Sequence, residues 1–565
     1  MYLYFKNQDM QTILRLEFKN IFPNERKREI LDYLKEIPKD ILLKYIGFAN
    51  HYPQPNFDNF FSNPEIKEEI CYRVLKYCVE NNVSNKPVVI SREASLRVTE
   101  FILSKKKELL DDNNQSDIDR GELNFFKIFL VINEELNAKD EKRTSSKENF
   151  EKIVDMSISS SFPLADLGLY DINDIDFYKL IYCTLIRFNY LLEFLKSKDE
   201  YKYLEDSLCA YFSISDTKKL LYQVKCLLVN LFVMKTHGGY EFIVEDKNQI
   251  RFLDSFVSEV IDEDNDFTNL RNFPMLKVEE NVYIVIDFFF VLDKFTKSTK
   301  FVLKDSFNKK HGLPDNDRSF FSFYNTEFSE MFLMKNILDE LFHDSLYIKK
   351  KETGNHKNEP DYYARYKDRV YLFENKDVMV AKGVKGSGDI EKINEAMQTK
   401  FNKNGIGIDQ LIYSIKKIAD KTFKYEDGAN KRNDLVIYPI LLVSDRIFMC
   451  QGLNYRLNTW YREKIGDKFS MNPLVKDLTV IDIDTLIYWL PYLKQKQNNF
   501  RKIIHNHTNI MTDAFKSKLK KKRKHTMSFY LSKIDNQLRP ISERLRRVRL
   551  DPKYILSLFK DVLPE

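Results

Sequence analysis

Three residues in the C-terminal half of this chain have the types and spacing that phosphate chemistry needs: Asp361, Glu374 and Lys376. Side chains two positions apart in a β-strand point to the same face, so Glu374 and Lys376 would project together from one strand. Carboxylate oxygens are hard ligands that suit Mg²⁺ or Mn²⁺, and such an ion can hold a phosphate and its attacking water. A lysine beside the ion can orient that water and offset the charge that develops on phosphorus. These residues are therefore a candidate metal-dependent site for cleaving phosphate esters.

Two adjacent strands are predicted to position the three residues. Strands at 361–366 and 370–376 would be joined by a short polar turn. A hairpin of this kind would bring Asp361 beside Glu374. The second strand opens with the apolar run Val-Tyr-Leu-Phe, which is typical of a central, buried strand where an unpaired glutamate is costly. The alternative is that the glutamate and the lysine form a solvated salt bridge on a hairpin at the edge of a sheet.

The elements predicted around this hairpin come in a defined order. They are an amphipathic helix at 328–342, a short strand at 346–348, the hairpin, helices at about 390–401 and 409–423, and a strand at 435–443. In sequence this is a helix, three strands, a helical stretch and a further strand.

With the Pro-Asp dipeptide that opens the hairpin, this order resembles the PD-(D/E)xK nuclease superfamily, which has the restriction-endonuclease-like fold. The resemblance covers roughly residues 320–450, about a quarter of the chain. It implies that Asp361 and Glu374 are metal ligands, with the backbone carbonyl of Asn375 as a third. It also implies that Lys376 is the catalytic lysine.

The resemblance suggests further members of the site. Family members often place another acid on the preceding helix, and here Glu330 is the candidate, ahead of Glu327 and Glu340. Some members also carry a glutamine, and sometimes a tyrosine, on the later helix near the site. Gln410 and Tyr413, about one helical turn apart, would fit that place.

The length and composition predict an α+β, multidomain protein. With 565 residues the chain is too long for one ordinary core, and its 15 Gly and 16 Pro favour long helices over tight hairpins. We expect a mainly helical part at 1–300, the nuclease-like α/β part at 315–450, and a basic, mainly helical segment at 451–565. Within the first part, a short strand pair is predicted at 240–244 and 250–252.

The charge is distributed unevenly along the chain. The net charge is +6, but residues 496–550 hold 16 Lys and Arg against three acids, a local charge of +13, which leaves about −7 elsewhere. The basic residues form clusters at 516–524 and 544–549. Such density suits neutralisation of nucleic-acid phosphates, and beside a nuclease-like site we expect double-stranded DNA. The alternative is a solvated helix face, or a surface paired with the acidic remainder of the chain.

Several other classes of protein and site are disfavoured. The six cysteines are scattered, without the spacing of a zinc site or a disulfide framework. The N-terminus lacks a signal-peptide core, and the most apolar run, 282–292, is too short for a membrane span, so we expect a cytoplasmic protein without a membrane partner. The consecutive residues 505–507 spell His-Asn-His but lack the spread of an HNH nuclease motif, and we expect an exposed basic stretch. The glycines at 383–388 lack Walker spacing and predict a loop beside the site.

These features support two main functional hypotheses. The resemblance implies a Mg²⁺- or Mn²⁺-dependent nuclease that hydrolyses DNA phosphodiester bonds, by analogy an endonuclease of a bacterial defence or restriction-type system. The alternative is a non-catalytic nucleic-acid-binding or assembly protein that keeps a nuclease-like fold, and RNA is a third possibility as substrate. The helical N-terminal half would bind a partner protein or a second copy, since cutting both strands of a duplex needs two sites or two visits.

Overall fold

The computed structural model describes most of the chain. The described residues are 2–6, 9–13, 15–51, 59–83, 87–110, 117–143, 150–167, 174–259, 261–264, 266–351, 359–466, 473–496, 498–512, 534–544 and 550–563. The basic cluster predicted at 516–524 lies outside them, as does most of the cluster at 544–549.

A mixed sheet in the C-terminal half carries the predicted site. Its strands are β6 (Ile348–Lys351), β7 (Tyr362–Tyr366), β8 (Arg369–Lys376), β9 (Val436–Val443), β10 (Leu474–Val475) and β11 (Thr479–Asp482). The order is β10-β9-β8-β7-β6, and β11 also pairs with β9. Strands β6, β7 and β8 are antiparallel neighbours, whereas β8, β10 and β11 run parallel to β9. The prediction of a central, buried second strand is confirmed, and the edge-hairpin alternative is wrong.

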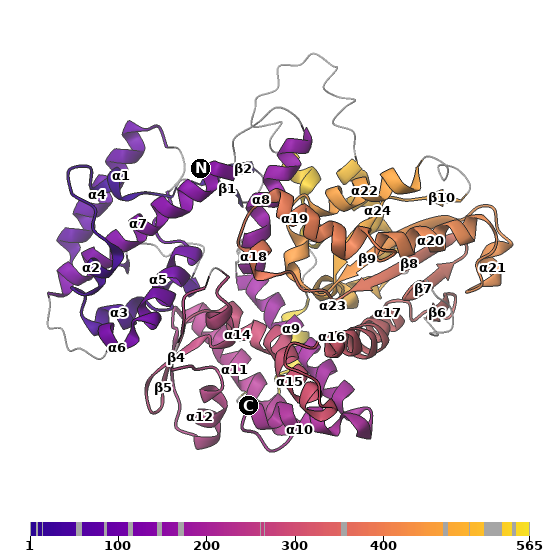
Figure 1. Cartoon of the computed structure of the whole chain (residues 1–565), viewed down its shortest axis with the longest axis horizontal. Coiled ribbons are helices and arrows are strands. Elements are labelled where there is room, and N and C mark those ends of the chain that lie inside the picture. Colours follow the sequence, from indigo (N-terminus) through magenta and orange to yellow (C-terminus); the bar gives the residue numbers. More distant parts are fainter. Residues whose placement is uncertain are drawn as a thin grey trace, which may run out of the picture.

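Helices cover both faces of this sheet (Figure 1). Alternate residues of β8 point to opposite faces, so Tyr371 and Phe373 pack in one core and Val370 and Leu372 in another. The helices of the first core include α9 (Asp174–Lys196), α17 (Lys335–Leu341), α23 (Ile483–Leu493) and α24 (Asn499–Thr512). Those of the second are α8 (Phe150–Leu167), α19 (Ile390–Met397), α20 (Ile408–Ala419) and α22 (Leu453–Ile465). The apolar character of β8 follows from this burial on both faces.

The remaining described elements near the sheet are short. They are α18 (Lys382–Lys385), η6 (Gln398–Asn402), α21 (Asp427–Asn430), η7 (Arg446–Met449), η9 (Ile541–Glu543) and α27 (Pro552–Ser557). The segment predicted as a glycine loop at 383–388 thus begins as the short helix α18.

The N-terminal half is mainly helical, as predicted. Its first group contains β1 (Tyr2–Lys6), β2 (Asp9–Ile13), α1 (Phe18–Ile21), α2 (Ile30–Leu34), α3 (Lys39–Tyr45), η1 (Phe48–His51), α4 (Pro64–Glu80), α5 (Arg92–Ser104), α6 (Lys106–Leu109) and α7 (Ile118–Arg143). Helices α1 to α6 lie at the left of Figure 1. The second contains η3 (Asp199–Tyr201), α10 (Lys202–Tyr211), α11 (Thr217–His237), β3 (Glu241–Ile243), α12 (Lys247–Asp254), α13 (Thr268–Asn272), β4 (Met275–Glu279), β5 (Val282–Val285), α14 (Phe288–Asp293), η4 (Lys294–Ser298), α15 (Thr299–His311), α16 (Ser319–Phe323) and η5 (Tyr324–Met334). Among the described residues, three segments are π-helical: η4, η5 and η6.

Two predicted boundaries differ from the structure. Residues 250–252 lie in α12 rather than in a strand, and β3 pairs instead with β5. The boundary expected at residue 450 cuts through the sheet, because β10 and β11 pair with β9. The chain is therefore a mixed α/β protein with mostly helical content, in which the sheet extends beyond the predicted α/β part.

Candidate active site

The hairpin of β7 and β8 carries the predicted residues at its open end. In its two-residue turn Lys367 has a φ of 54°, a left-handed conformation that suits the twist of a tight hairpin. At the other end the ladder pairs Tyr362 with Phe373. The next pair in the same register is Asp361 and Glu374, so the hairpin brings these two residues together as predicted.

The carboxylate of Asp361 is held by the backbone of the neighbouring strand. Its Oδ2 accepts a hydrogen bond from the N–H of Asn375 over 2.6 Å, and the residue is 7% exposed. The side chain of Asn375 points to the opposite face, where its Nδ2 donates to Oγ of Ser329 over 3.0 Å. Asn375 thus connects Asp361 on one side of β8 to the helical segment η5 on the other.

Glu374 is fully buried, and one of its two oxygens is unsatisfied. Nζ of Lys376 lies 2.6 Å from Oε1, whereas Oε2 has no hydrogen-bond partner among the described residues. Burial raises the pKa of Glu374 well above its ordinary value, and the charge of Asp361 raises it further. A buried carboxylate oxygen without a partner is costly, and a cation at this position would satisfy it and offset both acids.

Lys376 keeps its proton in this environment. Burial alone would lower the pKa of Lys376, but the charges of Glu374 and Asp361 raise it above its ordinary value. The lysine therefore presents a positive charge at the end of β8. Its side chain is 15% exposed, so it lies at the boundary between the core and the surface.

The three acids considered on the preceding helix have different surroundings in the structure. Glu330 lies close enough to raise the pKa of both Glu374 and Lys376. Glu327 instead accepts from Lys198 and Tyr201, and Glu340 pairs with Lys494 over 2.5 Å. Glu330, on the π-helical segment η5, is thus the acid of the three whose charge acts on the site.

Gln410 and Tyr413 are placed differently from the expectation. The side-chain oxygen of Gln410 accepts from the N–H of Gly407 over 2.8 Å, so this residue closes the first turn of its own helix. Tyr413 is 41% exposed and lies under the amine of Lys417. No contact described for either side chain joins it to the three central residues.

No protein-family model, curated protein or solved structure matches this chain. The described residues contain no cluster of three or more His, Cys, Asp or Glu side chains already arranged around a metal position. The groups that could hold a cation are two side chains and one backbone group: Asp361, Glu374 with its unsatisfied Oε2, and, by the resemblance, the carbonyl of Asn375.

In the part of the chain that the structure covers, no helix is both long and apolar enough to cross a membrane.

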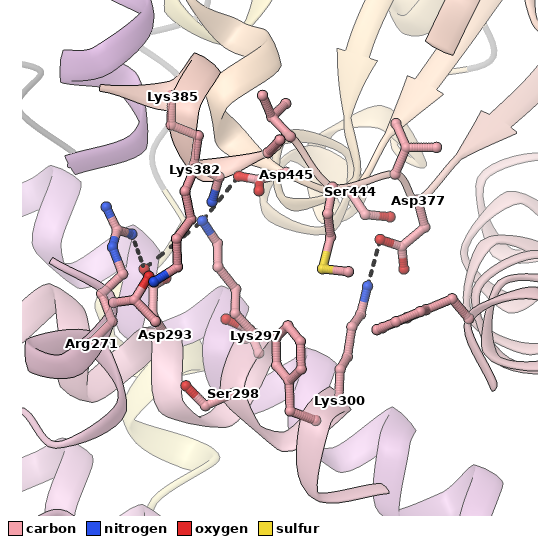
Figure 2. Close-up of a pocket in the computed structure, with 18 of the residues that line it drawn as sticks. Arg271, Asp293, Lys297, Ser298, Lys300, Asp377, Lys382, Lys385, Ser444 and Asp445 are labelled. Carbon is pink, nitrogen blue, oxygen red and sulfur yellow. Dashed lines mark hydrogen bonds and ion pairs between the residues drawn. The ribbon is translucent and has the colours of Figure 1, made fainter. Parts of the chain in front are cut away.

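A second ion pair, missed in the sequence, directly adjoins the site. Nζ of Lys300 lies 2.5 Å from Oδ1 of Asp377, the residue after Lys376, and both side chains are at most 9% exposed. Figure 2 shows Lys300 rising from α15 to meet Asp377 at the end of its strand. The sequence offers one signal for Asp377, because this residue directly follows Lys376, the candidate catalytic lysine. The lysine lies 77 positions away along the chain, and no local pattern connects the two residues.

The His-Asn-His stretch is a structural feature of α24, and the expectation of an exposed stretch is wrong for its last residue. His507 is fully buried, with Nε2 2.8 Å from Oδ1 of Asn454, and its Nδ1 accepts from Nε of Arg544 over 3.3 Å. These contacts connect α24 to α22 and to the C-terminal region. They give His507 a role in packing.

Proposed function

We propose that this protein is a Mg²⁺- or Mn²⁺-dependent nuclease that hydrolyses DNA phosphodiester bonds at Asp361, Glu374 and Lys376. The observation that carries the proposal is the buried, unsatisfied Oε2 of Glu374, in register with Asp361 and beside the amine of Lys376. Converging acids of this kind are unfavourable by themselves, and a divalent cation offsets them.

Each residue has a role that follows from its position. Asp361 and Glu374 would hold the cation, together with the carbonyl of Asn375, and the bound ion would supply a polarised phosphate and an activated water. Lys376 holds its proton and places a positive charge where negative charge develops on the phosphate. Glu330 adds a further negative charge beside Glu374 and Lys376 and helps to retain a cation.

The proposal also covers the substrate of the nuclease and its biological role. The +13 segment at 496–550 suits binding along a DNA backbone, and we propose double-stranded DNA as substrate. By analogy, such a nuclease joined to a large helical part suits an endonuclease of a bacterial defence or restriction-type system. A second copy, bound through the helical half, would provide the second site that cleavage of both strands needs.

A cleavage assay on supercoiled plasmid DNA, with Mg²⁺ and then Mn²⁺, tests the proposal. We expect the wild type to nick or linearise the plasmid, and Lys376→Met and Asp361→Asn to be slower by about 100-fold or more. Lys349→Ala, on the neighbouring strand β6, is the matched control and should cleave like the wild type.

The same assay separates the alternatives. Equal cleavage by the wild type and both site variants would exclude this site. Salt-sensitive DNA binding without turnover in any metal would favour the non-catalytic alternative. A parallel digestion of single-stranded RNA and DNA decides between the two polymers.

A further inference from the structure

A pocket of about 820 Å³ opens where strands β8 and β9 end. Its wall includes Asp377, one residue beyond Lys376, and Ser444, one residue beyond the end of β9. Figure 2 shows the facing wall, where Lys297 and Lys300 rise from η4 and α15. The pocket therefore begins next to the candidate active site, between the sheet and the second helical group.

The pocket has an excess of positive charge that the protein does not fully neutralise. Eight basic and four acidic residues line it. Most of these cations are in ion pairs, for example Lys300 with Asp377. Lys400 and Arg318 form no salt bridge with any described residue. Burial lowers the pKa of Lys400, and the charge of Arg318 lowers it further. Two cations that line one pocket, close enough to influence each other and without a salt-bridge partner among the described residues, form a site suited to an anion.

An exposed aromatic surface lies in the same pocket. Phe301 is 47% exposed although it lines the pocket, and its ring centroid lies 6.0 Å from that of Phe321 in an edge-on arrangement. Met379, which follows β8, also lines the pocket and is 38% exposed. A large apolar side chain exposed in a basic pocket provides a surface on which a flat, apolar ring can stack.

The backbone around the pocket is also unusual. Within the described ranges, π-helical turns occur in η4, η5 and η6, and all three contribute lining residues: Lys297 from η4, Asn325 from η5 and Lys400 from η6. Such turns are uncommon and occur frequently at functional sites. Three of them around one pocket argue against a chance gap between packed helices.

We propose that this pocket binds an unpaired nucleotide of the nucleic-acid strand, with its base on Phe301 and a phosphate at Lys400 and Arg318. A paired and stacked base cannot present its face to a protein ring, so the occupant is a single-stranded end, a gap or an extruded nucleotide. This inference rests on the proposed nuclease function and deepens it. It assigns to the enzyme a preference for DNA in which unpaired nucleotides lie beside the bond that is cut.

Binding measured in EDTA, where cleavage is prevented, tests the pocket separately from the nuclease chemistry. The probes are a fluorescein-labelled single-stranded octanucleotide and a labelled, fully paired duplex whose two ends are closed by non-nucleotide linkers, and their binding is followed by fluorescence anisotropy. We expect the wild-type chain to prefer the single strand. Phe301→Ala should weaken single-strand binding about tenfold and leave duplex binding unchanged. Lys400→Ala should weaken single-strand binding and reduce its salt dependence.

Two matched controls exclude general effects. Tyr72→Ala removes a 67% exposed aromatic ring from α4, and Lys218→Ala removes an exposed lysine from α11. Both should bind like the wild type. Equal affinities of Phe301→Ala and Tyr72→Ala for the single strand would overturn the proposal. Displacement of the octanucleotide by deoxyadenosine monophosphate at equal nucleotide concentration would also overturn it, and would assign the pocket to a free nucleotide.

The outcomes distinguish this inference from the proposed function. If Lys376→Met cleaves like the wild type while Phe301→Ala loses single-strand binding, the nuclease site is wrong and the nucleotide pocket stands. If Lys376→Met is inactive while Phe301→Ala binds normally, the nuclease site stands and the pocket is refuted.

Discussion

The backbone N–H of Asn375 donates a hydrogen bond to the carboxylate of Asp361 over 2.6 Å. The regular ladder of the hairpin ends one pair earlier, at Tyr362 and Phe373, so this bond extends the connection between the strands to the candidate site. Because Asn375 lies between Glu374 and Lys376, the strand that presents those side chains also sets the position of Asp361. The geometry of the three residues is thus one local unit.

Glu374→Gln should stabilise the metal-free protein while it removes activity. The charges of Asp361 and Glu330 both act on Glu374, and Lys376 supplies the compensating ammonium, so loss of one buried charge relieves repulsion. In EDTA the apparent melting temperature should rise by about 1–3 °C. Addition of Mn²⁺ should raise the melting temperature of the wild type but leave that of the variant unchanged.

Glu426→Gln is the matched control for this experiment. Glu426 is also a buried carboxylate beside the sheet, but its oxygens are paired with Arg365 and Tyr363, at 2.7 and 2.9 Å. Its replacement should lower the melting temperature and preserve the response to Mn²⁺. An equal Mn²⁺ response in wild type and Glu374→Gln would contradict metal binding at Glu374.

Glu330→Gln should slow DNA cleavage by about 10- to 100-fold, because this acid supports the charge balance around Glu374 and Lys376. Glu327→Gln, three positions earlier on the same helical segment, should cleave normally, since Glu327 pairs with Lys198 away from the site. Initial rates of plasmid DNA cleavage, at matched protein concentration, measure the effects of Glu330→Gln and Glu327→Gln. Equal rates for the two variants would remove Glu330 from the site.

Arg92→Leu should destabilise the protein by about 3–5 kcal/mol, because it leaves a buried aspartate without its partner. The guanidinium of Arg92 contacts both oxygens of Asp287 at 2.5 Å, and the two side chains are 2% and 4% exposed. Urea denaturation followed by circular dichroism measures the loss. Arg73→Ala breaks an exposed pair with Glu69 and should change stability by only about 0.5 kcal/mol. A similar small change in Arg92→Leu would contradict the prediction.

His507 should make the fold less stable at acidic pH. Burial, with the nearby charge of Arg544, lowers the pKa of His507 from 6.5 to about 3. Below pH 6.5 the unfolded chain takes up a proton that the folded chain excludes, so the free energy of unfolding falls as the pH is lowered from 6.5 towards 3. His507→Gln should reduce this slope by up to about 1.4 kcal/mol per pH unit in urea titrations. Urea titrations of the wild type at each pH are the reference. An unchanged slope in His507→Gln would contradict the prediction.

The hairpin could be predicted because its signals are local. An apolar strand, a polar turn and an alternating side-chain direction are properties of neighbouring residues, and together they place Asp361 opposite Glu374. Short strands are harder to predict. Residues 474–475 and 479–482 are strands because they pair with β9. These six residues contain no local pattern that predicts β9 as their partner. At 250–252 a strand was predicted where the structure has a helix, because apolar residues at short spacing suit a helix as well as a strand.

By itself, the sequence determined the mainly helical N-terminal half, the order of elements around the hairpin, and the alignment of Asp361, Glu374 and Lys376. All of these depend on spacing along the chain. Three features depend on tertiary packing instead: the charge of Glu330 acts on the site, Gln410 caps its own helix, and a basic, aromatic pocket adjoins Lys376. The reason is physical: burial and charge depend on the packing of segments that are far apart in sequence, and that packing is a property of the whole fold.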